Sequence, residues 1–194
     1  MNFWIPSRLL NILRERAEKQ ALPCKEFIRR LIQRVLDEPD LLDGYSKALA
    51  EVRCLIMEKK KKDEFCIIGI DGRDGSGKTT LASWLAWNLS IPVVHLDFYY
   101  KFFMCEDFLI QERMIDLRNT ISNRISDKRP VIVEGVLLLE TLRRIGLSPD
   151  YLVYVHCEEL PDGPLFFRII QPYMDTWEPQ KRANSIVSRV ESSG

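Results

Sequence analysis

A glycine-rich segment at residues 69–80, GIDGRDGSGKTT, carries residue types that suit phosphate binding. Its Gly72, Gly77, Lys78 and Thr79 match the spacing G-x-x-x-x-G-K-[ST]. Glycines are needed there because backbone N–H groups must turn inward around phosphate oxygens, which leaves no space for side chains. The lysine would reach the β- and γ-phosphates, and the threonine hydroxyl would ligate magnesium. The segment predicts a nucleoside triphosphate site with ATP and Mg2+ as ligands, although no residue pattern distinguishes ATP from GTP.

Nucleotide contacts are expected from the whole loop and from the first turn of the helix that follows it. The helix would begin near Lys78 and would add its positive N-terminus to the site. Lys78 is therefore a catalytic candidate as well as a binding residue. The expected contacts are Gly72, Asp74, Gly75, Ser76, Gly77, Lys78, Thr79 and Thr80.

Two acids follow neighbouring predicted strands, at the end of a parallel sheet where phosphates bind. Asp97 ends the stretch VVHLD, and Glu134 ends VIVE. Either carboxylate could help to hold magnesium together with Thr79, and one that faces the acceptor could take its hydroxyl proton. Taken alone, such an acid also fits a helix cap or a solvated strand end. Together with the loop, the two acids favour phosphoryl transfer.

These residues need a sheet to position them, and the chain after residue 64 alternates short apolar runs with helical patterns. That alternation is typical of a parallel sheet covered by helices on both faces. We expect strands at 65–70, 92–96, 130–134, 151–155 and 185–190. We expect helices at 45–64, 78–89, 113–125, 137–145 and 164–175. The predicted fold class is α/β, a P-loop NTPase domain at 39–194 built on a five-stranded parallel sheet.

Three segments resemble the uridine kinase-like branch of the P-loop nucleoside and small-molecule kinases. They are the phosphate loop IDGRDGSGKTTLA, the strand end HLDFYY and the segment VIVEGVLLL; EPQKRANSIV is similar to the closing loop and last strand of the family. The resemblance covers about residues 45–190. It implies phosphoryl transfer to a hydroxyl of a nucleoside or similar small metabolite, with Asp97 as the base and Glu134 as a second carboxylate on the magnesium side. Tyr99 and Tyr100 would contact this small-molecule acceptor, although core packing is an equal alternative for the aromatic residues 98–103.

Two departures from the family pattern bear on function. The stretch between Asp97 and Glu134 is shorter than the insertion that recognises the nucleoside, so the acceptor stays open. The lid segment HCEELPDGPLFFRII is short and acidic, and Arg168 is its one lid-like arginine. Because a lid arginine can contribute about three to five orders of magnitude to phosphoryl transfer, a reduced lid predicts slow turnover or none. A nucleotide-binding regulator with little kinase activity is therefore the alternative function.

Residues 1–38 form a separate candidate module, which resembles ribbon-helix-helix proteins. A short start, NFWIP, precedes two amphipathic helical patterns between Ser7 and Glu38. The module holds eight Lys or Arg against five Asp or Glu, a net charge of +3. We expect it to form a homodimer, because two isolated helices of this size rarely fold alone. DNA binding and packing onto the kinase-like domain remain alternatives.

Overall composition narrows the class of protein further. The 28 basic and 28 acidic residues balance, so no global field favours nucleic acid or an anionic membrane. The five cysteines are widely spaced and form no C-x-x-C pair, which argues against a disulfide framework or a zinc site. No apolar run approaches the roughly 18 residues of a membrane span, and the N-terminus lacks the features of a signal peptide. A cytoplasmic protein without a membrane partner is expected.

Overall fold

Two compact units divide the chain in the computed structural model, Met1–Leu42 and Asp43–Gly194. The structure describes residues 18, 23, 25–26, 39–100, 111–157 and 166–189. Residues 18, 25 and 26 have helical backbone. The predicted ribbon, the packing of the two predicted helices, the dimer and the DNA-binding surface lie outside the described residues and stay predictions.

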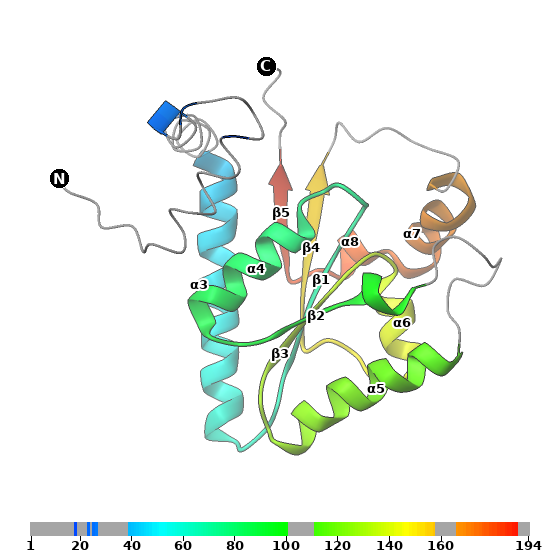
Figure 1. Ribbon diagram of the computed structural model, residues 1–194. Helices are drawn as coiled ribbons and strands as arrows, with labels where there is room; N and C mark the ends of the chain where they lie inside the picture. The colour runs from blue at the N-terminus through cyan, green and yellow to red at the C-terminus, as the bar shows by residue number, and fades with distance from the viewer. Residues whose placement is uncertain are drawn as a thin grey trace. The chain divides into compact units, whose positions relative to one another are not determined.

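Five strands of the second unit form one parallel sheet, which confirms the predicted fold class (Figure 1). The strands are β1 (Ile67–Gly72), β2 (Val93–His95), β3 (Val131–Glu134), β4 (Tyr151–Cys157) and β5 (Ser185–Arg189). Their order across the sheet is β2-β3-β1-β4-β5. Because the strands are parallel and β3 lies between β1 and β2, the segments that follow these three strands meet at one edge.

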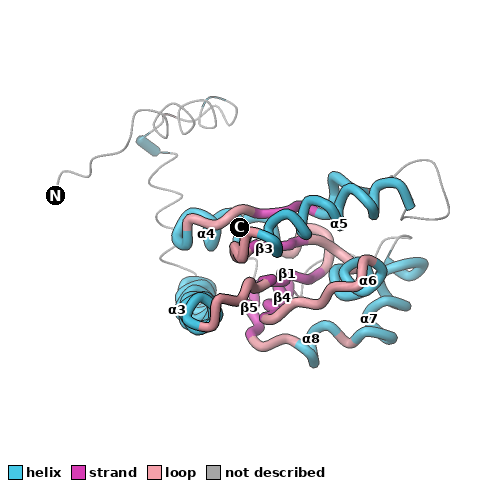
Figure 2. The backbone as a smooth tube through the Cα atoms, turned by 90° about the horizontal axis from the view of Figure 1, so that it is seen from below, coloured by secondary structure: helices cyan, strands magenta, loops and turns pink. Residues whose placement is uncertain are grey.

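Helices cover both faces of this sheet (Figure 2). Figure 2 shows α3 (Pro39–Lys61) and α4 (Lys78–Leu89) on one face, and α5 (Gln111–Ser126) and α6 (Leu138–Arg144) on the other. Every residue of β1 and β3 is buried. Strand residues point alternately to the two faces, so a strand covered on both sides is apolar along most of its length. The runs Ile67–Ile68 and Val131–Val133 meet that requirement.

Four shorter elements complete the described part of the chain. They are the 3-10 turn η1 (Leu96–Tyr99), the π-helical turn η2 (Phe166–Ile170), α7 (Gln171–Trp177) and α8 (Pro179–Arg182). The described part of the segment predicted as a single helix at 164–175 is therefore η2 followed by α7. Helix α3 begins at Pro39, earlier than the predicted position 45, because a proline at the first helical position loses no hydrogen bond. Among the described helices, none is both long and apolar enough to cross a membrane.

Helix α3 ends in a run of lysines. Lys59, Lys60 and Lys61 form its last turn, where cations interact favourably with the helix dipole. Lys59 Nζ lies 2.9 Å from Asp150 Oδ1 and 3.1 Å from Glu64 Oε2. The other carboxylate oxygen of Asp150 accepts the Ile67 N–H at 2.8 Å. The end of α3 is thereby joined to the starts of β1 and β4.

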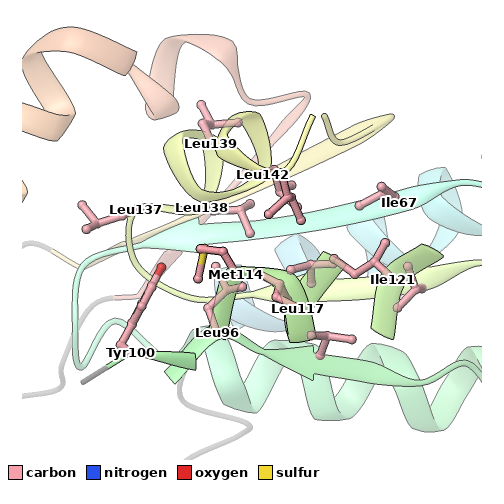
Figure 3. Packing of buried hydrophobic residues seen from close by; sticks show 14 of the residues in the cluster. Ile67, Leu96, Tyr100, Met114, Leu117, Ile121, Leu137, Leu138, Leu139 and Leu142 are labelled. Atoms are coloured by element: carbon pink, nitrogen blue, oxygen red, sulfur yellow. The ribbon is translucent and has the colours of Figure 1, made fainter. Parts of the chain in front are cut away.

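A hydrophobic cluster supports the edge of the sheet that follows β2 and β3 (Figure 3). It includes Leu96, Leu117, Leu138 and Leu142, which have no exposed surface. Leu96 packs tightly against Gly135: a Cβ atom on Gly135 would lie 2.6 Å from Leu96 Cβ. Only glycine permits this approach, so the start of η1 is held against the residue that follows β3.

Candidate functional site

The glycine-rich segment forms the predicted strand, loop and helix. Strand β1 ends at Gly72, and α4 begins at Lys78. Gly72 has φ +150°, and a Cβ atom there would lie 2.4 Å from the Val155 carbonyl oxygen of β4. The Ser76 N–H donates to the Arg73 carbonyl at 3.2 Å and closes a turn within the loop. A side chain at position 72 would therefore displace the loop from the sheet.

The N-terminus of α4 has the properties of an anion site. Its N-cap residue is Gly77, in the left-handed conformation, and no side chain caps the helix. The first turn contains no acidic residue, although acids are favourable there. The Ser76 hydroxyl beside it is buried, and among the described residues it has no hydrogen-bond partner. A buried hydroxyl next to uncapped N–H groups suits a phosphate oxygen, because such groups otherwise lose hydrogen bonds on burial.

The Lys78 side chain folds back over the loop. Its Nζ donates to the Arg73 carbonyl at 2.6 Å, and the residue is 7% exposed. Burial lowers the pKa of Lys78, while the carboxylates of Asp71, Glu134, Asp74 and Asp97 raise that pKa. The positive charge of Lys78 thus interacts favourably with all four carboxylates.

Glu134 connects three segments of the site. It is the last residue of β3 and is 1% exposed. Its Oε1 accepts a hydrogen bond from the Thr79 hydroxyl at 3.2 Å and lies 2.6 Å from His95 Nδ1. His95 is the last residue of β2 and stands opposite Glu134 in the β2–β3 register. The carboxylate is therefore oriented before any ligand binds.

Asp97 lies in η1, two residues beyond the strand that the sequence expected it to end. Strand β2 stops at His95, and Asp97 occupies the first turn of η1 with its side chain exposed. Partial desolvation and the charges of Glu134 and Asp74 raise the pKa of Asp97, whereas the charges of Lys78 and His95 lower it. Asp97 therefore belongs to the same electrostatic group as Lys78 and Glu134.

Thr79, Asp97 and Glu134 are the residues that would hold magnesium. Within the described ranges, no cluster of three or more His, Cys, Asp or Glu side chains forms a metal site made of protein alone. Magnesium usually keeps several waters and takes one or two carboxylates plus substrate phosphates. The contact of 3.2 Å between Thr79 Oγ1 and Glu134 Oε1 puts two hard oxygen ligands beside the phosphate loop. This donor set fits magnesium shared with a nucleotide.

The two tyrosines predicted to contact the acceptor have different surroundings. Tyr99 is half-buried, and its hydroxyl lies 3.2 Å from Thr120 Oγ1. Tyr100 is 5% exposed within the hydrophobic cluster. Its hydroxyl donates to the Val136 carbonyl at 2.7 Å and lies 2.9 Å from Thr141 Oγ1. A contact between Tyr100 and an acceptor would require this buried arrangement to open.

The other predicted residues lie on the surface. Asp74 is exposed, and its Oδ1 accepts the N–H of Gly75 at 3.0 Å within the loop. Thr80 is exposed in the first turn of α4. Arg168 is exposed in η2, and the part of the lid before residue 166 lies outside the described residues. Their roles stay predictions.

Asp71 of β1 and Tyr173 of α7 form a buried pair beside the loop that the sequence patterns did not indicate. Asp71 is 1% exposed, and its Oδ1 accepts the Gly72 N–H at 2.7 Å. The Tyr173 hydroxyl donates to Asp71 Oδ2. Burial raises the pKa of Asp71 to about 6, with the bonds from Tyr173 and Gly72 opposing the rise. The available signal was an acid inside an otherwise apolar strand, Ile67–Gly72, although nothing local identified its partner 102 residues away.

Comparison with known proteins adds similarity of fold to this geometry. No protein-family model matches the chain, and no curated protein matches it. A possible uridine kinase from Bacillus stearothermophilus is 22% identical, with a TM-score of 0.43 over 70% of this chain and 98% of that one. A sugar kinase from a Janibacter species is 16% identical, with a TM-score of 0.45 over 65% of this chain and 85% of the other. Shikimate kinase from Bacteroides thetaiotaomicron is 20% identical, with a TM-score of 0.32 over 62% and 84%. At these identities and TM-scores, the similarity assigns neither a reaction nor a substrate to this chain.

Proposed function

We propose that the chain is an ATP- and magnesium-dependent kinase that transfers the γ-phosphoryl group to a hydroxyl of a nucleoside or a similar small metabolite. The observation that carries the proposal is the phosphate-binding character of the loop. An uncapped α4 N-terminus, the buried Ser76 hydroxyl and the Lys78 ammonium are adjacent in sequence, and all three suit phosphate oxygens. Asp97 follows β2 and Glu134 ends the neighbouring strand β3, and the two would supply the acids that phosphoryl transfer uses.

Nucleotide binding would exchange contacts that the loop makes with itself. Lys78 Nζ now bonds to the Arg73 carbonyl, and it would leave that oxygen for the β- and γ-phosphates. The Thr79 hydroxyl would leave Glu134 Oε1 and would hold magnesium together with the Glu134 and Asp97 carboxylates. Magnesium, when bound, would neutralise charge on the phosphates and on the leaving oxygen.

Asp97 is the proposed general base. It would accept the proton of the acceptor hydroxyl while that oxygen forms a bond to the γ-phosphorus. The bond from this phosphorus to the β–γ bridging oxygen breaks, and ADP leaves. A raised pKa of Asp97 favours this role, because a base is most effective when its pKa approaches the working pH. Arg168 is the proposed lid cation for the charge that develops on the phosphoryl group.

Transfer from radiolabelled ATP tests the proposal. The full chain is incubated with γ-labelled ATP, magnesium and a panel of nucleosides and sugars, and label in the acceptor is measured. Lys78→Ala and Asp97→Asn are the matched variants. We expect transfer by the native sequence, and a loss in Asp97→Asn of about two to four orders of magnitude, the usual contribution of general acid–base catalysis.

Two results contradict the proposal in different ways. A native chain that binds ATP but labels no acceptor above the level of Lys78→Ala would exclude the kinase and favour a nucleotide-binding regulator. A native chain that binds neither ATP nor ADP in the presence of magnesium would exclude both functions. Equilibrium dialysis with labelled ATP separates these outcomes.

A further inference from the structure

The Tyr173 hydroxyl joins three elements inside the protein. It donates to Asp71 Oδ2 of β1 and accepts the Leu139 N–H at the start of α6 at 3.1 Å. Tyr173 itself belongs to α7, where its ring stacks on Trp177 with centroids 6.5 Å apart. Tyr173 and Asp71 are both buried. A single phenol therefore links α7, the first turn of α6 and the end of strand β1 before the phosphate loop.

Asp71 connects this link to the loop. One carboxylate oxygen accepts the N–H of Gly72, the first glycine of the motif, and the other accepts the Tyr173 hydroxyl. With both oxygens held, the carboxylate has one orientation. Among the carboxylates that raise the pKa of Lys78, Asp71 has the largest effect. The Gly72 amide and the Lys78 ammonium thus both depend on where Asp71 sits.

We propose that Asp71 and Tyr173 are positioning residues of the phosphate loop, and that binding of an anion to the loop is coupled through them to uptake of a proton by Asp71. The proposal rests on the proposed function to the extent that the loop must bind a nucleotide. The hydrogen bonds at Gly72 and Leu139 set the position of the loop. The buried carboxylate of Asp71 couples anion binding to proton uptake.

The coupling follows from electrostatics. Phosphates that bind beside Lys78 bring negative charge towards a carboxylate that is already difficult to ionise, since burial raises the pKa of Asp71 to about 6. Added negative charge favours the protonated carboxyl, so binding takes up protons and affinity falls as the pH rises from about 6. The groups that face Asp71 are Tyr173 from α7, Lys78 and the Gly72 amide from the loop, with Tyr154 of β4 and Tyr100 after η1 further out.

Tyr173→Phe removes the hydroxyl and keeps the ring. Asp71 then loses a hydrogen bond that stabilises its ionised form, so its pKa rises and the pH dependence of binding moves to higher pH. The loop also loses one of its fixed contacts, and we expect the dissociation constant of the nucleotide at pH 5.5, where Asp71 is mostly protonated in both chains, to increase about fivefold. Asp71→Asn removes the titrating group, and we expect proton uptake on binding to fall to the amount contributed by the nucleotide alone.

Tyr151→Phe is the matched control. The Tyr151 hydroxyl also donates to a carboxylate, that of Glu51, but at the start of β4, the opposite edge of the sheet from the loop. Its loss should lower stability in the same way without changing nucleotide affinity or its pH dependence.

Titration calorimetry of the full chain with a non-hydrolysable ATP analogue and magnesium, at pH 5.5 to 8.5 in buffers of different ionisation enthalpy, tests the inference. Altered affinity and a shifted pH profile in Tyr173→Phe, with Tyr151→Phe unchanged, support it. A Tyr173→Phe chain with native affinity and native pH profile overturns it while leaving the proposed function intact. Absence of binding by the native chain overturns both. If Tyr173→Phe does not fold, undiminished proton uptake in Asp71→Asn overturns the coupling, and its loss supports it.

Discussion

Replacement of Gly135 by alanine should disturb the site through packing rather than through chemistry. Gly135 follows Glu134 and has φ +159°. The new Cβ would lie 2.6 Å from Leu96 Cβ and 3.1 Å from Leu96 Cδ1. The nearest atom is attached directly to the backbone of η1, so a change of rotamer cannot relieve the clash. The substitution must move η1, which carries Asp97, away from β3, which carries Glu134.

The magnitude has two parts. A non-glycine residue in this backbone region costs about 1–3 kcal/mol, and overpacking of a dense core costs about 1–3 kcal/mol. We expect Gly135→Ala to lower the free energy of unfolding by about 2–6 kcal/mol, a large share of the roughly 5–15 kcal/mol that stabilises a typical domain. Phosphoryl transfer by the folded fraction should also fall, because the two acids separate.

Urea unfolding of three alanine variants measures these parts separately. Gly146 has φ +75° with no atom within 4 Å of an added Cβ, so Gly146→Ala carries strain alone, about 1–2 kcal/mol. Gly44 lies within α3, and its added Cβ would meet Val187 Cγ1 at an ordinary 3.5 Å. Gly44→Ala should stabilise the chain by about 0.5–1 kcal/mol, because alanine favours the helix. If Gly135→Ala destabilises no more than Gly146→Ala, the argument from packing is wrong.

Three further predictions concern acids of the described region. Asp71→Asn should gain stability relative to the native chain as the pH rises from 4 to 7. Burial raises the folded pKa of Asp71 from 3.8 to about 6. The protonated carboxyl therefore stabilises the native chain below pH 4, and this stabilisation, on the order of 3 kcal/mol, is lost as the pH rises through 6. Urea unfolding of both chains at pH 4.5 and 7.5 measures it, and a difference in unfolding free energy that does not change with pH would contradict the prediction. Asp150→Ala leaves the Ile67 N–H without its acceptor, and should cost about 1–3 kcal/mol. Lys59→Met should cost less than Asp150→Ala, because the ion pairs of Lys59 are solvated. Glu134→Gln should keep nucleotide affinity, measured by dialysis, within about tenfold, while phosphoryl transfer, measured by label in the acceptor, should fall by on the order of a hundredfold. An equal loss of affinity and of transfer would indicate a structural rather than a catalytic contribution of Glu134.

Sequence alone was enough for the local elements of this fold. The phosphate loop, the five strands and helix α4 follow from patterns within about a dozen residues: glycine spacing, β-branched runs and amphipathic stretches. Each of these segments has one favourable conformation that its own residues specify. The parallel sheet then follows, because strands separated by helices pair in parallel.

Turns and irregular helices were less predictable. Asp97 was expected at a strand end and lies in η1, and residues 166–177 form a π-helical turn followed by α7. Hydrophobic periodicity over four or five residues does not distinguish a strand end from a 3-10 turn, or a π-turn from the start of an α-helix. The choice depended on what each turn packs against: for η1, Gly135 below Leu96.

Tertiary structure alone decided which polar groups meet. The Thr79, His95 and Glu134 contacts cross 39 to 55 residues of chain, and the bond between Tyr173 and Asp71 crosses 102. Tyr100 lay within a motif that resembled an acceptor-binding segment, yet its hydroxyl is held in the core by Val136 and Thr141. Such pairings have no local pattern, since a buried hydroxyl or carboxylate takes whichever partner the packing of distant elements leaves within reach. The sequence therefore predicted where a phosphate chain would bind, and the packing of α6 and α7 against the sheet determined what holds that loop in place.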